Sequence, residues 1–138
     1  MFVRILLIGS AAGLVLSGWM FLWQQLTGIR VYTLLMNVDF IPILKQVEWS
    51  QLMLNLFHLI ISWAIVPVYI LMKRKLTVNN WLIGLVMSAA VACIYFPLVI
   101  LAVKSVPSLW DGYALLIWYT GHLLYGIFLV KLTDIIKM

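Results

Sequence analysis

The fold is decided by residues 48–72, EWSQLMLNLFHLIISWAIVPVYILM, an apolar run that carries no charge after Glu48. As a helix rising 1.5 Å per residue, this run is long enough to cross the hydrocarbon core of a bilayer, which is about 30 Å thick. Six polar residues recur along it at intervals of three, four, three, four and seven. We call these six the polar stripe: Glu48, Gln51, Asn55, His58, Ser62 and Tyr69. Because no water satisfies a polar group in hydrocarbon, the polar stripe is predicted to face the protein interior.

The whole chain has the composition of a membrane protein. Of its 138 residues, 66% are hydrophobic and 9% are charged, and the mean hydropathy is +1.15. This composition leaves too little polar surface for a soluble globule. The net charge of +5 does not indicate nucleic-acid binding, because the basic residues lie at the ends of apolar segments, as topology signals do. The single cysteine, Cys93, excludes an intramolecular disulfide.

The hydrophobic pattern predicts an all-helical integral membrane protein with one domain, a four-helix transmembrane bundle. The predicted helices cover residues 5–26, 48–72, 80–103 and 112–130, and the first is an uncleaved span rather than a signal peptide. Residues 30–47 are too polar and interrupted to span, yet apolar enough to form an interfacial or re-entrant element. Both termini are predicted to be cytoplasmic, because six basic residues lie on their side against three on the other. The six are Arg4, Lys73, Arg74, Lys75, Lys131 and Lys137, and the three are Arg30, Lys45 and Lys104.

Small residues at four-residue intervals predict two helix-packing faces. Gly9, Gly13 and Ser17 form one in the first helix, and Gly84 and Ser88 belong to another in the third. The first face is expected either to pack against the helix at 80–103 within one copy or to support a homodimer.

Two histidines are predicted to lie at the same depth in the membrane. His58 and His122 are each about ten residues inside a helix that enters from the outer side, hence about 15 Å deep. We call the predicted set of inward polar and aromatic residues around them the polar layer: Gln51, Asn55, His58, Ser62, Trp118, His122 and Tyr125. In a simple up-and-down bundle these two helices are diagonal, so the sequence leaves open whether the two rings touch.

Three interpretations of the polar layer compete. The histidines form hydrogen bonds across the bundle and fix its register, or the layer conducts protons or a small solute. In the third interpretation, His58 and His122 are the axial ligands of a b-type haem. A zinc site is disfavoured because only two good ligands lie at this depth.

Four polar residues outside the spans form an outer-face candidate site for a cation or a cationic group: Asn37, Asp39, Glu48 and Asp111. The favoured alternative is that Asn37 and Asp39 satisfy their own backbone while the other acids cap helices. No nucleophile and base in a catalytic order, no glycine-rich phosphate loop and no paired carboxylates occur, so the sequence predicts no enzyme.

Several stretches resemble the YagU-type bacterial inner-membrane proteins, over about Phe57 to the C-terminus. They are FHLIIS at residues 57–62, KRKL at 73–76, WLIGL at 81–85, FPL at 96–98 and WYTGHLLY at 118–125. Both histidines fall on matching positions. The resemblance implies a location in the bacterial cytoplasmic (inner) membrane, and the family has no established biochemical activity.

Together these observations predict a small, non-enzymatic, multi-pass membrane protein without a cofactor or metal. Its favoured function is that of an accessory or interaction subunit in the lipid bilayer, as a homodimer or in a larger complex. The alternatives are a minimal transporter, or a conduit for protons or a small solute, and a haem-binding protein.

Overall fold

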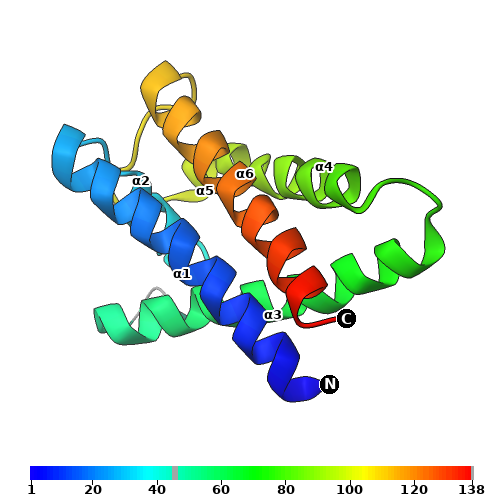
Figure 1. Ribbon diagram of the computed structural model, residues 1–138. Helices are drawn as coiled ribbons and strands as arrows, with labels where there is room; N and C mark the ends of the chain where they lie inside the picture. Colours follow the sequence, from blue (N-terminus) through cyan, green and yellow to red (C-terminus); the bar gives the residue numbers. More distant parts are fainter. Residues whose placement is uncertain (45–46, 138) are drawn as a thin grey trace.

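The computed structural model describes residues 1–44 and 47–137, and within them it is helical and contains no strand (Figure 1). Four spans are long and apolar enough to cross a membrane: α1 (Phe2–Thr27), α3 (Gln51–Lys75), α4 with α5 (Asn80–Leu101) and α6 (Gly112–Ile135). A short helix, α2 (Val31–Leu35), follows α1. The predicted four-helix membrane fold is therefore confirmed. Lys45, counted above among the outer basic residues, lies outside the described residues.

The spans alternate in direction, and both termini lie at the same end of the bundle (Figure 1). We call this end the inner end and the opposite one the outer end, following the predicted topology. Going round the bundle, α1 packs against both α3 and α6, and α6 packs against α4. Contacts between α3 and α4 are sparse. The helices that carry the two histidines, α3 and α6, are therefore diagonal.

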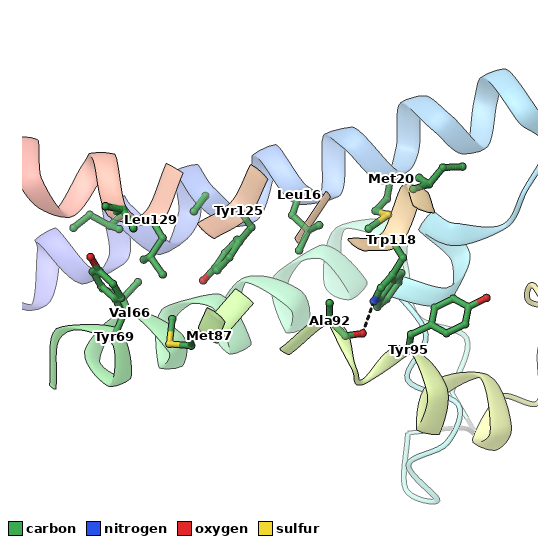
Figure 2. Close-up of a cluster of buried hydrophobic side chains, with 14 of the residues drawn as sticks. Leu16, Met20, Val66, Tyr69, Met87, Ala92, Tyr95, Trp118, Tyr125 and Leu129 are labelled. Carbon is green, nitrogen blue, oxygen red and sulfur yellow. Dashed lines mark hydrogen bonds between the residues drawn. The ribbon is translucent and has the colours of Figure 1, made fainter. Parts of the chain in front are cut away.

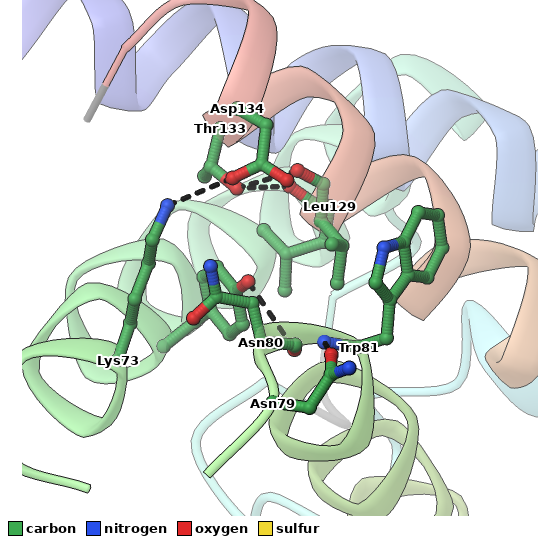
Figure 3. A network of polar contacts seen from close by, with 9 residues as sticks. Lys73, Asn79, Asn80, Trp81, Leu129, Thr133 and Asp134 are labelled. Atoms are coloured by element: carbon green, nitrogen blue, oxygen red, sulfur yellow. Dashed lines mark hydrogen bonds and ion pairs between the residues drawn. The ribbon is translucent and has the colours of Figure 1, made fainter. Parts of the chain in front are cut away.

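The ends of α3 differ from the sequence prediction. It begins at Gln51 and not at Glu48, because Ser50 is the N-cap and its side chain accepts a hydrogen bond from the Met53 backbone N–H. It continues past residue 72 to Lys75, and Pro67 does not interrupt it. At the inner end, Lys73 Nζ lies 2.8 Å from Asp134 Oδ1 and ties α3 to α6 (Figure 3).

The predicted helix at residues 80–103 is two helices, α4 (Asn80–Ala92) and α5 (Tyr95–Leu101). At the junction, the backbone N–H groups of Cys93 and Ile94 bond to carbonyls three residues back, which ends the regular helix. The cause is Pro97, which has no N–H to donate to the Cys93 carbonyl and whose ring crowds it.

The short helix α2 is folded into the outer end of the bundle. Val31 and Leu34 are fully buried, and α2 packs against α1 and α6. Its Tyr32 hydroxyl accepts hydrogen bonds from the amides of Gln51 and Asn55, at 2.9 and 3.0 Å. Gln24, near the end of α1, accepts a hydrogen bond from the Thr33 backbone N–H at 2.9 Å. These bonds hold α2 against α1 and α3, which is how an apolar segment too short to span is accommodated at the outer end of the bundle.

Both small-residue faces are used inside one copy of the chain. Gly9 and Gly13 lie against Trp63 and Ser62 of α3, and not against the helix at 80–103, which was one of the two alternatives for this face. Ser17 is buried and bonds to a carbonyl within α1. On the other side of the bundle, Gly84 and Ser88 of α4 lie against Gly126 of α6.

The hydrophobic core extends through the bundle (Figure 2). On the inner side of the two histidines, Val66, Tyr69 and Leu129 are fully buried and fill the space between α3 and α6. On the outer side, Trp118 is fully buried, and its Nε1 donates a hydrogen bond to the Ala92 carbonyl at 2.9 Å. Ala92 is the last residue of α4, so this bond satisfies a carbonyl at the helix break.

Candidate functional site

His122 is held in one orientation by its own helix. Its Nδ1 lies 2.8 Å from the Trp118 carbonyl oxygen. A carbonyl only accepts, so Nδ1 carries the proton and donates, and Nε2 of the neutral ring is left as an acceptor. The Trp118 ring lies against the imidazole, with centroids 4.8 Å apart. The imidazole is therefore held both by its hydrogen bond to the Trp118 carbonyl and by contact with the Trp118 ring, which is itself anchored to Ala92.

His58 is packed against α1. Its ring lies beside the backbone of Gly13. Its Nε2 is buried and has no well-formed hydrogen bond within the described part of the chain. A buried imidazole nitrogen without a partner is costly, so this atom is suited to a water molecule or a ligand.

The two histidines line one central cavity of about 80 Å³. Ser62, Trp118 and Tyr125 also line the central cavity. Since a water molecule occupies about 30 Å³ in the liquid, this space suits roughly two or three waters.

Ser62 links three helices beside the central cavity. Its hydroxyl donates to the Gly9 carbonyl at 2.7 Å and lies 3.1 Å from the Tyr125 hydroxyl. The structure thus brings together five members of the predicted polar layer. The other two, Gln51 and Asn55, are nearer the outer end and bond to Tyr32.

Two further pockets follow the central cavity towards the outer end. The middle pocket, about 220 Å³, lies between α3 and residues 35–44, and it shares Leu35, His58 and Ile61 with the central cavity. The outer pocket, about 290 Å³, shares Met36 and Leu54 with the middle pocket. Its polar lining consists of Gln24, Gln25, Tyr32, Thr33, Gln51 and Lys104.

Apart from Gln51, the polar residues of the outer pocket were not predicted as site residues from the sequence. They come from α1, α2, α3 and the connection between α5 and α6, and no periodicity links these segments. The adjacent glutamines Gln24 and Gln25, at the end of an apolar helix, were the one local signal.

The four outer-face candidates do not form one site. Asp39 Oδ2 accepts hydrogen bonds from the backbone N–H groups of Val103 and Lys104, at 3.2 and 2.8 Å, and Asn37 Oδ1 accepts one from Asp39 N–H. Asp111 caps α6 by accepting from the Ala114 N–H. Glu48 is exposed and precedes α3 instead of capping it.

The arrangement of these residues bears on the metal and haem interpretations. Among the described residues, no group of three His, Cys, Asp or Glu side chains is placed to hold a metal ion. The central cavity is also well below the roughly 300 Å³ at which pockets begin to enclose drug-sized ligands. A haem between His58 and His122 would need more space than the central cavity by itself provides.

Comparison of the chain with known protein families, with characterised proteins and with solved structures finds no match. The resemblance to the YagU-type proteins therefore stays a prediction.

Proposed function

We propose that this integral membrane protein is a minimal transporter whose ligand reaches the two histidines from the outer end of the bundle. The observation that carries the proposal is the position of His58, which lines both the central cavity and the middle pocket. The middle pocket adjoins the polar outer pocket, so the histidine is the innermost part of a series of spaces that begins at the membrane surface.

The two histidines are suited to bind rather than only to fix the bundle. If they served register alone, we would expect each to bond across the bundle. Instead, the hydrogen bond of His122 is within its own helix, and His58 contacts only the Gly13 backbone of the neighbouring α1, while its Nε2 has no partner among the described residues. Ser62 and Tyr125 supply a separate contact between helices, which leaves Nε2 of each imidazole for a ligand.

The other interpretations have less support. An accessory subunit or homodimer that packs through small-residue faces has less support, because Gly9, Gly13 and Gly84 face helices of the same chain. A continuous proton conduit is disfavoured by the apolar packing of Val66 and Leu129 on the inner side of the histidines. A non-enzymatic role and the bacterial inner membrane remain part of the proposal, the latter on the strength of the YagU-type resemblance.

Transport in proteoliposomes tests this function. The panel contains protons, small inorganic anions, acetate and a fluorescent phospholipid, and each flux is compared with protein-free vesicles. We expect at least one flux that is raised by the native protein and lowered tenfold or more by His58→Leu and by His122→Leu. Leu71→Ala, at an exposed position of α3 that lines none of the three pockets, is the matched control. If the native protein raises no flux in the panel, or both histidine variants match it, the proposal is wrong.

A further inference from the structure

We infer that the three pockets together form a seat for one anionic phospholipid of the leaflet at the outer end, with its headgroup in the outer pocket and one acyl chain reaching the histidines. This inference rests on the proposed function and names the ligand class of the same site. Four properties of the pockets support it: their polarity, their length, their opening to the bilayer and their charge.

From the outer pocket to the middle pocket the lining changes from polar to apolar, as a phospholipid does from its headgroup to its acyl chains. The outer pocket is lined by amide, hydroxyl and ammonium groups. The middle pocket is lined mainly by aliphatic and aromatic side chains, among them Phe40, Ile41, Phe57 and Ile60. Apolar lining of this kind disfavours a small hydrophilic solute and suits an acyl chain.

The length of the series also fits. Along α3 the lining runs from Gln51 in the outer pocket to Ile65 in the central cavity. At 1.5 Å per residue this is about 21 Å, against about 15 Å for the hydrocarbon of one leaflet. The pockets therefore extend from the membrane surface to the midplane.

The central cavity opens sideways to the bilayer. Its walls include Ile61 of α3, which is 59% exposed, and Ile94 at the junction of α4 and α5, which is 46% exposed. These residues stand on either side of the sparse contact between α3 and α4. In a membrane, side chains exposed at this depth meet lipid, so a chain has lateral access to the cavity.

The charge of the site selects an anionic headgroup. Lys104 lines the outer pocket, and its ammonium makes no ion pair within the described part of the chain. No carboxylate lines any of the three pockets. The chain has four acids, and three are engaged elsewhere, Asp39 with backbone amides, Asp111 as a helix cap and Asp134 with Lys73. The fourth, Glu48, is exposed.

Native mass spectrometry of the full chain tests the inference, with detergent micelles containing equal amounts of phosphatidylglycerol and phosphatidylcholine. We expect one retained phosphatidylglycerol per chain and a preference of at least fivefold over phosphatidylcholine. Lys104→Gln should reduce this preference below twofold. Arg30→Gln is the matched control, because Arg30 is also an outer cation but lines a different pocket, and it should keep the preference.

A second pair of variants tests the acyl-chain groove. Ile61→Trp fills the boundary between the central cavity and the middle pocket, and it should lower lipid retention fivefold or more. Leu71→Trp, exposed on the same helix and lining none of the three pockets, should retain lipid as the native protein does. If Ile61→Trp lacks the native circular dichroism spectrum, Ile94→Trp on the opposite wall takes its place.

Three results would overturn the lipid seat. They are equal retention of the two lipids by the native protein, equal effects of Lys104→Gln and Arg30→Gln, and full retention by the groove variant. Histidine-dependent flux of an ion without lipid selectivity would refute the lipid seat and leave the transporter standing. Selective retention without any flux would support the seat and refute transport.

Discussion

Replacing Gly9 by alanine should separate α1 from α3. A Cβ atom at Gly9 would lie 2.7 Å from Trp63 Cδ1 and 3.1 Å from Trp63 Cα. The second atom is backbone, and the indole is held by a hydrogen bond from its Nε1 to Ser10 Oγ at 2.9 Å. Neither group moves away easily, so the substitution overpacks the interface. We expect a loss of about 1–3 kcal/mol in the free energy of unfolding, the usual range for overpacking.

The control for this substitution lies on the same helix. A Cβ atom at Gly18 would meet no atom within 4 Å. Because alanine favours helix over glycine by up to about 1 kcal/mol, Gly18→Ala should leave stability unchanged or raise it slightly. Unfolding by sodium dodecyl sulfate in mixed micelles, followed by circular dichroism, measures both variants. Equal stabilities within about 0.5 kcal/mol, or a larger loss for Gly18→Ala, would refute the packing argument.

Three further predictions concern polar contacts. Trp118→Phe removes the donor for the Ala92 carbonyl and should cost about 1 kcal/mol in the same unfolding assay; an unchanged stability would contradict the role of this bond at the helix break. Asp39→Ala removes the acceptor for two backbone amides before α6, and amide hydrogen exchange there should become at least tenfold faster, whereas unchanged protection would show that the carboxylate does not hold this connection. Lys73→Met breaks a partly exposed ion pair with Asp134 and should cost less than about 1 kcal/mol, so a loss above 2 kcal/mol would contradict the assignment of a surface ion pair.

The break between α4 and α5 shows how far sequence reasoning reached in the fold. Pro97 lies near the end of the predicted helix at residues 80–103, and its missing N–H is a local property that the sequence alone shows. The break lies at Cys93 and Ile94 because the N–H of residue 97 would bond to the Cys93 carbonyl in a regular helix, and proline has no N–H. The end of α3 at Lys75 was harder to place, because basic residues continue a helix as readily as they follow one.

The polar stripe illustrates the corresponding limit for the site. Its periodicity predicted a face turned to the protein interior, and in the structure His58 and Ser62 of that face line a cavity that His122 also lines. It did not separate them from Gln51 and Asn55, which bond to Tyr32 of α2. The difference depends on where a five-residue helix from another part of the chain is inserted, and spacing within one helix carries no information on that.

By itself, the sequence determined that this protein is a four-span membrane bundle. The length and hydropathy of a segment decide whether it can cross a bilayer, and both are properties of consecutive residues. The tertiary structure alone decided which helices meet. Gly13 lies beside His58, Gly126 lies against Ser88, and the sparse contact between α3 and α4 leaves the histidine cavity open at its side. These pairings depend on shape complementarity between distant segments. Many different apolar sequences could supply such contacts, so the sequence alone does not say which helices pair.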